Sequence, residues 1–342
     1  MVHWGAVRAV GGAVGGIVVG GLASSWLLAG TASATAPPPF AARPQPGTVK
    51  VVDPNGNAKV ELRIGDSAFA EVYVFGAHVT RFNTKSESHP ILFLSKKAVL
   101  DGSKAIRGGI PIIFPHRRRI LTWHSFQGFA RTSKWKVAKH SGEDNFAEVT
   151  LTLASNEETM KIWPHQFSSS YTVRLFPDSL ECVWEVENTS KKDPLTFTSA
   201  LHSYFQVDVW HVFPDVEKIT LGDLANLKYS DTTNNGQIRD SEAPLLKVKG
   251  EIDRLYINTP KQICINDKDG VIQITKDESL PDAVIWNPAP EKSKAMKDFD
   301  DSEWKQMICV EPAAVHKPVV LAPGAKWSTT MLIRKSYKSS KL

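Results

Sequence analysis

From Gly47 onward, hydrophobic and polar residues alternate along short runs, which is the pattern of half-buried β-strands. The runs are rich in β-branched and aromatic residues, and turn-forming clusters such as "DPNGN", "FPDS", "NDKDG" and "LAPG" separate them. The clearest runs are "AKVELRI", "FAEVYVFGAHVTRF", "FAEVTLTLA", "SSSYTVRLF", "SLECVWEVEN", "LTFTSALHSYFQV", "KQICIND", "GVIQITK", "DAVIWNP", "KQMICVEP" and "WSTTMLIRK". Short strands at regular intervals predict an all-β protein with antiparallel strands, a sandwich or barrel rather than a parallel α/β sheet.

Residues 48–337 are expected to form one domain, a single large antiparallel β-sandwich, because nothing resembling an interdomain linker interrupts the strands. The chain lacks the sequence motifs of dinucleotide-binding enzymes, P-loop nucleotidases, α/β-hydrolases and zinc metalloproteases. The chain has no GxGxxG after a first strand, no Walker loop, no GxSxG and no HExxH. The glycine-rich "IRGGIP" lies between strand-like runs, so it predicts a tight loop rather than the phosphate-binding start of a helix.

The N-terminal segment, residues 1–35, is apolar. No charged residue occurs from Ala9 to Ala42, and this run is long enough to cross a bilayer. Arg8 precedes the run and "TASA" follows it. A basic start, an apolar stretch and small residues at the exit predict a secretory signal that is cleaved after Ala34.

The same segment supports a second interpretation as an uncleaved anchor. Gly12, Gly16 and Gly20 have the GxxxG spacing of membrane helices that pack against another helix. In that case the protein would contact the membrane through residues 9–30. Residues 36–47, "APPPFAARPQPG", then predict a proline-rich linker.

The C-terminal end of the chain carries a different targeting signal. The tail, residues 338–342, ends in Ser340-Lys341-Leu342, the tripeptide that the peroxisomal import receptor reads. A protein sent into the secretory pathway does not normally meet that receptor. A fixed terminal tripeptide rarely arises by chance, so we expect a peroxisome-type organelle such as a glycosome, with the secretory pathway or a membrane anchor as the alternative.

The charge and the cysteine content indicate which ligands and cross-links the protein is expected to have. Lys and Arg number 41 against 36 Asp and Glu, and the resulting charge of +5 is scattered. The absence of a basic helix or an interleaved aromatic patch argues against nucleic-acid binding, while an anionic small substrate remains compatible. Cys182, Cys264 and Cys309 lie far apart in apolar runs, which predicts core residues and neither a disulfide framework nor a metal site.

The run "LTFTSALHSYFQVDV" contains one ionisable residue, His202, in an otherwise apolar strand. A lone histidine of this kind is usually a core residue that is hydrogen-bonded to a backbone carbonyl. Four stretches favour a chemical role instead: "DGSKAIRGGIPIIFP", "QGFARTSKW", "TSALHSYF" and "MICVEPAAVHKPVVLAPGAKW". Together with "FGAHVT", "GEIDRLY", "DAVIWNP" and "DFDDSEWKQM", and in this order, they resemble the glucose-6-phosphate 1-epimerase branch of the aldose 1-epimerase (galactose mutarotase-like) family.

The resemblance covers residues from about 50 to 335 and implies a galactose mutarotase-like supersandwich with no metal or cofactor. It places an acid–base pair at His202, in the "HxYF" motif, and Glu311, in the "CVEP" motif. Interconversion of the anomers of a cyclic sugar needs such a pair. A carboxylate removes the proton from O1, and an imidazolium protonates the ring oxygen O5.

The resemblance also implies which residues bind the substrate. Arg107 in "IRGG" and Arg131 in "GFAR" carry over as phosphate-binding arginines, whose guanidinium groups match phosphoryl oxygens. Lys104 is a candidate to assist them. Asp253 in "GEIDRLY" occupies the position of an acceptor for sugar hydroxyl groups.

The sequence departs from the family pattern at one substrate-binding position. The family usually has a histidine before the "GFAR" glycine, where this chain has Gln127, which hydrogen-bonds but cannot be charged. His124 or His116 could take its place, and Arg117 to Arg119 add a basic triplet. Two alternatives to a sugar-phosphate mutarotase therefore stay open: a mutarotase for unphosphorylated aldoses, and a catalytically idle sugar-binding or assembly subunit of the same fold.

Overall fold

The computed structural model describes residues 44–53, 56–85, 89–116, 127–207, 214–241, 243–268 and 270–337. The described residues all belong to one compact unit, Pro44–Leu342. The predicted N-terminal signal or anchor, the arginine triplet, His124 and the Ser-Lys-Leu tail lie outside the described residues. None of the described helices is long and apolar enough to cross a membrane.

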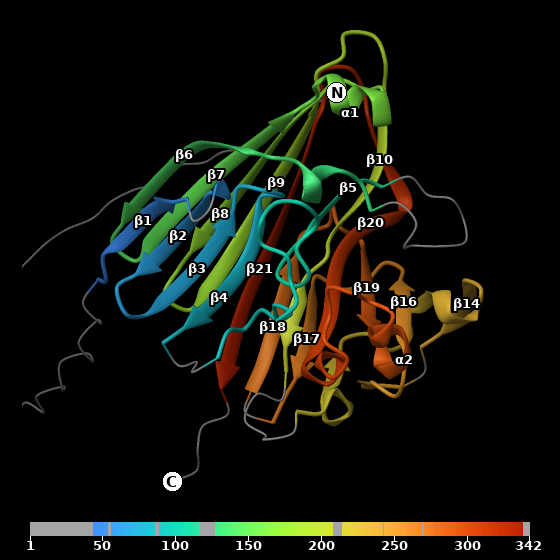
Figure 1. Ribbon diagram of the computed structural model, residues 1–342. Helices are drawn as coiled ribbons and strands as arrows, with labels where there is room; N and C mark the ends of the chain where they lie inside the picture. The colour runs from blue at the N-terminus through green and yellow to red at the C-terminus, as the bar shows by residue number, and fades with distance from the viewer. Residues whose placement is uncertain are drawn as a thin grey trace, which may run out of the picture. The chain divides into compact units, whose positions relative to one another are not determined.

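The described unit is built from three antiparallel sheets (Figure 1). Sheet A has the strand order β1 (Gly47–Val52), β2 (Lys59–Ile64), β3 (Ala68–Tyr73), β4 (His78–Thr84). Sheet B has the order β14 (Gln237–Asp240), β13 (Lys228–Asp231), β16 (Ile252–Tyr256), β19 (Asp282–Asn287), β20 (Met307–Leu321), β10 (Leu195–Leu201), β5 (Ile112–His116), and β11 (Tyr204–Gln206) also pairs with β20. Sheet C has the order β15 (Leu246–Lys247), β12 (Thr220–Gly222), β17 (Gln262–Asn266), β18 (Gly270–Lys276), β21 (Lys326–Tyr337), β9 (Ser179–Asn188), β8 (Phe167–Leu175), β7 (Phe146–Ala154), β6 (Lys136–Glu143).

Helices are few and short in the described residues. They are α1 (Glu157–Ile162), α2 (Ala289–Lys294) and the 3-10 turns η2 (Ala130–Thr132), η3 (Val216–Lys218), η4 (Thr232–Asn234) and η5 (Glu303–Gln306). The predicted all-β class and the large antiparallel sandwich are confirmed. Gly47, the last residue of the predicted linker, already begins β1.

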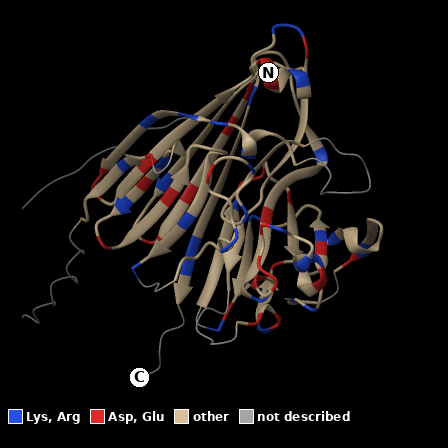
Figure 2. Cartoon of the chain, in the orientation of Figure 1, with Lys and Arg blue, Asp and Glu red and all other residues tan. Residues whose placement is uncertain are grey.

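One hydrophobic core is shared by the three sheets. It contains Val60 of sheet A, Val310 of sheet B and Val173 of sheet C, all fully buried. Figure 1 shows β1–β4 lying against the β6–β9 part of sheet C, with the strands of sheet B toward its other end. Acidic and basic residues are interspersed along the outer strands (Figure 2), and several are paired across strands, as Arg174 is with Glu148 and Glu181.

Strand β20 separates the core from a second face of sheet B. Ile308 and Val310 belong to the shared core, whereas Met307, Cys309 and Ala313 belong to smaller clusters on the opposite face. This division follows from the period of two along a strand. We call the opposite face of sheet B the site face.

Some local predictions were wrong in detail. The run predicted as one strand at residues 195–207 is two strands, β10 and β11, and His202 lies in the break between them. Its backbone N–H donates to the carbonyl of Pro111 rather than to β20. Cys182 and Cys309 are buried as expected, but Cys264 is only half-buried, because its strand β17 turns alternate residues away from the core.

Candidate active site

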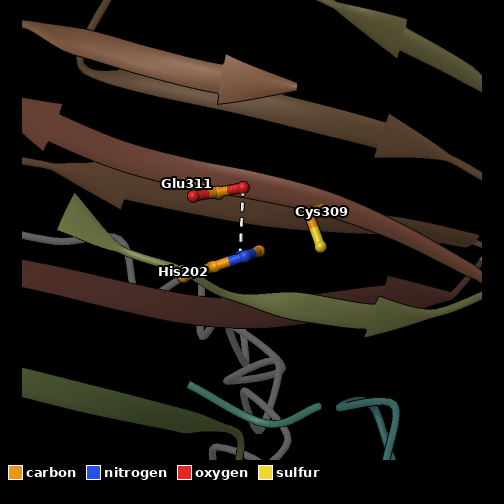
Figure 3. A group of neighbouring side chains, drawn as sticks. All are labelled: His202, Cys309 and Glu311. Carbon is orange, nitrogen blue, oxygen red and sulfur yellow. Dashed lines mark ion pairs between the residues drawn. The ribbon is translucent and has the colours of Figure 1, made fainter. Parts of the chain in front are cut away.

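His202 and Glu311 lie together on the site face of sheet B. His202 Nδ1 is 3.0 Å from Glu311 Oε1, and the residues are 3% and 1% exposed (Figure 3). Their positions follow from the strands. Glu311 lies two residues after Cys309 on β20, so both side chains point to the site face, and the break after β10 brings the His202 ring against them.

Glu311 is a buried carboxyl group with an unusual proton affinity. Burial raises its pKa well above the usual value, the nearby negative charge of Asp253 raises it further, and the charge of Arg131 lowers it. Glu311 Oε2 is buried and has no hydrogen-bond partner among the described residues. A buried carboxylate oxygen without a donor is energetically unfavourable, so this atom is suited to accept a hydrogen bond from a bound molecule.

Tyr204 lies against the His202 ring. The two rings are stacked with their centroids 4.6 Å apart and their planes at 17°. The Tyr204 hydroxyl is 3.3 Å from His202 Nε2, the ring nitrogen that does not face Glu311. Trp286 of β19 contacts both rings edge-on, with centroid distances of 6.0 Å, so the imidazole is held on several sides.

Arg107 reaches this cluster from the loop before β5. Its Nη1 donates to the Tyr204 hydroxyl at 3.1 Å, and its Nε donates to Asp298 Oδ1 at 3.3 Å. Burial by itself would lower the pKa of Arg107, but the neighbouring Tyr204 and Asp298 outweigh this effect and raise it. The guanidinium group is therefore a fixed positive charge close to the His202–Glu311 pair.

The tight turn predicted for "IRGGIP" positions Arg107. Gly108 and Gly109 have φ angles of 115° and 62°, in the region that favours glycine. A Cβ on Gly109 would lie 2.1 Å from the Val79 carbonyl oxygen and 2.7 Å from His78 Nε2. The His78 Nε2 atom is also 2.7 Å from the Gly108 carbonyl oxygen, so the buried His78 ring supports this loop.

His78 predicts a dependence of stability on pH. Burial lowers its pKa to about 4, which outweighs the opposing hydrogen bond with Gly108. Below its unfolded pKa of about 6.5 the unfolded chain therefore takes up a proton that the folded chain does not, and stability falls as the pH drops toward 4, by on the order of 3 kcal/mol. Urea unfolding at pH 7 and pH 4.5 measures this loss. We expect His78→Asn to reduce the difference between the two pH values, and the exposed control His140→Asn to leave it unchanged.

Arg131 lies in the turn η2. It is half-buried, and its positive charge acts on Glu311, Arg107 and His78. Burial, together with the like charge of Arg107, lowers the pKa of Arg131. The turn packs closely against sheet A, because a Cβ on Gly76 would lie 2.6 Å from the Arg131 carbonyl oxygen.

The other predicted substrate-binding residues differ in how close they lie to the pair. Asp253 is buried on β16, opposite Trp286 of β19, and its charge acts on Glu311. Gln127 is half-buried and immediately precedes Gly128, whose backbone bridges to Phe114. Lys104 is exposed and acts on the charge of Asp101, and none of the described contacts of the pair is with Lys104.

Sequence reasoning missed Tyr204, Asp298 and Trp286. The signal for Tyr204 was the period of two, since Tyr204 follows His202 by two residues and so shares its face. Asp298 and Trp286 reach the site through tertiary packing. The suggested substitute His116 is buried, and its Nδ1 is 2.9 Å from Thr198 Oγ1.

Three of these side chains offer atoms that could hold a metal ion. Ligand atoms of His202, Cys309 and Glu311 all lie within 4.8 Å of one another (Figure 3). The chemistry of the set opposes a cation, because burial raises the pKa of the Cys309 thiol well above its usual value and Arg107 and Arg131 add positive charge. The expected independence of metal stays a prediction.

The comparison with known families assigns the chain independently of this geometry. The family model described as aldose 1-epimerase matches residues 58–334. The chain belongs to the aldose 1-epimerase family. It is accordingly an isomerase with aldose 1-epimerase (mutarotase) activity.

Related proteins and structures support the assignment. The chain is 37% identical over 295 residues to a protein of Cenchrus ciliaris named "Putative glucose-6-phosphate 1-epimerase", covering 83% of this chain and 86% of that protein. A protein of Escherichia coli K12 with the same name is 29% identical over 244 residues, covering 70% of this chain and 77% of the relative. The crystal structure of a "putative mutarotase" from Salmonella typhimurium has the same fold, with a TM-score of 0.74 at 24% identity over 85% of this chain and 94% of that one.

Proposed function

We propose that this aldose 1-epimerase acts on glucose 6-phosphate and interconverts its α and β anomers without a cofactor. The observation that carries the proposal is the position of Arg107 and Arg131 beside the His202–Glu311 pair. Two guanidinium groups at the edge of a buried acid–base pair suit a sugar that bears a phosphoryl group. The names of the relatives from Cenchrus ciliaris and Escherichia coli support the same substrate.

In the proposed mechanism Glu311 is the general base and His202 is the general acid. Glu311 accepts the proton from the O1 hydroxyl while His202 donates a proton to O5, so the C1–O5 bond breaks and an aldehyde forms at C1. Rotation about C1–C2 exposes the other face of the aldehyde, and the same two groups then act in reverse to close the ring. The raised pKa of Glu311 makes its carboxylate a stronger base than an exposed one.

Glu311 Oε2, which has no hydrogen-bond partner among the described residues, fits the role of Glu311 as the base. The O1 hydroxyl of a bound sugar would donate to this oxygen. Asp253 is placed to accept from another sugar hydroxyl and, by raising the pKa of Glu311, to strengthen the base. The Gln127 side chain can hydrogen-bond the sugar in either ring form but carries no charge.

Magnetisation transfer between the anomers of glucose 6-phosphate by NMR tests the proposal with the full chain. We expect the enzyme to accelerate exchange between the two C1–H signals of glucose 6-phosphate, and to accelerate exchange of glucose far less. Comparable acceleration of glucose and glucose 6-phosphate would instead favour a mutarotase for unphosphorylated aldoses. A folded protein that accelerates neither sugar would favour the sugar-binding subunit and contradict the proposal.

A further inference from the structure

The Tyr204 hydroxyl connects the arginine side of the site to the imidazole. It lies 3.1 Å from Arg107 Nη1 and 3.3 Å from His202 Nε2, and the tyrosine is 1% exposed. A guanidinium group can only donate, so the tyrosine oxygen accepts from Arg107. The tyrosine proton is then left to donate, and His202 Nε2 is the acceptor that the structure places within reach.

This arrangement opposes the role of His202 as an acid. A ring nitrogen that accepts a hydrogen bond from Tyr204 carries no proton. The other ring nitrogen, Nδ1, faces Glu311, so Nε2 is the atom that must carry the proton for O5 of the sugar. With the tyrosine proton in this position, the Arg107–Tyr204 contact favours a form of His202 that cannot protonate the substrate.

The same contact shows how a bound substrate could allow His202 Nε2 to become protonated. A phosphate dianion forms stronger, charge-assisted hydrogen bonds with a guanidinium group than a neutral tyrosine hydroxyl does. Asp298 holds Arg107 through Nε and Nη2, so the guanidinium group stays in place when Nη1 changes its partner. The tyrosine oxygen can then turn its lone pairs toward His202, and Nε2 takes up a proton from solvent, donates it in a hydrogen bond to Tyr204 and passes it to O5 when the ring opens.

Resting on the proposed function, we propose that Tyr204 is a positioning residue that couples capture of the substrate phosphate by Arg107 to the protonation of His202. The phosphoryl group then contributes to the rate as well as to the affinity. When an unphosphorylated sugar binds, His202 Nε2 carries no proton and cannot act as the acid. The coupling would make the enzyme specific for sugar phosphates without steric exclusion of free sugars.

The first experiment compares Tyr204→Phe with the wild-type enzyme on glucose 6-phosphate and on glucose. Phenylalanine keeps the ring stack with His202 and removes only the hydroxyl. We expect the ratio of kcat/KM values, glucose 6-phosphate over glucose, to fall at least about tenfold, chiefly because turnover of glucose rises; this is about 1.4 kcal/mol of lost discrimination. Tyr171→Phe is the matched control, because Tyr171 is also fully buried but belongs to β8 in sheet C, and it should leave the ratio unchanged.

The second experiment supplies the phosphate separately. Inorganic phosphate added to the wild-type enzyme should accelerate the anomerisation of glucose, after subtraction of the uncatalysed rate at each phosphate concentration. In Tyr204→Phe the rate with glucose should be independent of phosphate. Imidazole nitrogen NMR on the wild-type enzyme, with His202→Asn for assignment, should show His202 Nε2 gaining a proton as inorganic phosphate is added.

Two results would overturn the inference. Tyr204→Phe could lower kcat/KM for both sugars by the same factor, which would show that Tyr204 only supports the packing of the His202 ring. Alternatively, neither kcat/KM value could change in a folded variant, which would show that the Tyr204 hydroxyl has no part in turnover. Either result leaves the proposed function intact, whereas a wild-type enzyme that fails to turn over glucose 6-phosphate refutes the proposed function before any variant is examined.

Discussion

Glu311→Gln is expected to lower kcat for the anomerisation of glucose 6-phosphate by roughly 100- to 10,000-fold, the usual contribution of one general acid–base group. Glutamine keeps the size of the side chain and removes the carboxylate that accepts the O1 proton. The fold should survive, because the variant replaces a buried charge that burial itself disfavours, as the raised pKa of Glu311 shows. NMR anomer exchange measures the rate, and thermal unfolding confirms that the variant is folded.

His202→Asn should lose activity to a similar extent, and the double variant should lose little more than either single one, since the two groups act in the same step. Glu148→Gln is the matched control: Glu148 is also a buried glutamate, but it pairs with Arg174 on sheet C. Full activity in a folded Glu311→Gln enzyme would show that Glu311 is a structural carboxyl group and that the proposed mechanism is wrong.

Arg107→Gln is expected to reduce kcat/KM for glucose 6-phosphate by about 10- to 100-fold, because a hydrogen bond to a charged group contributes about 1.5–3 kcal/mol. Turnover of glucose should not fall in parallel, since glucose has no phosphoryl group to lose contact with. The measurement is the ratio of kcat/KM values for the two sugars. Lys104→Gln, at an exposed position, is the control and is expected to change the ratio far less.

Arg131→Gln should lower the same ratio and also shift the pH profile. The positive charge of Arg131 lowers the pKa of Glu311, so its removal raises that pKa, and the rise in activity with pH that reports ionisation of Glu311 should move to higher pH. An equal loss of activity on glucose and glucose 6-phosphate in both arginine variants would contradict phosphate recognition by these residues.

The sequence by itself determined the all-β class, many of the strands and the family. The period of two in "MICVEP" identifies β20 and places Cys309 and Glu311 on one face, because alternate side chains of a strand point to opposite sides. The glycines of "IRGGIP" specified a tight turn, since only glycine readily adopts the positive φ angles found there. The order of the motifs along the chain was sufficient to indicate the family.

Only the tertiary structure decided how these parts meet. The break between β10 and β11 turns the His202 ring onto Glu311, and a local pattern cannot specify such a break because it depends on pairing with β20 and on the bond to Pro111. The contacts of Arg107 with Tyr204 and Asp298 join segments far apart in the sequence. Burial, which raises the pKa of Glu311, is likewise a property of the packed sheets: periodicity sets the face on which a side chain lies, and packing sets what covers it.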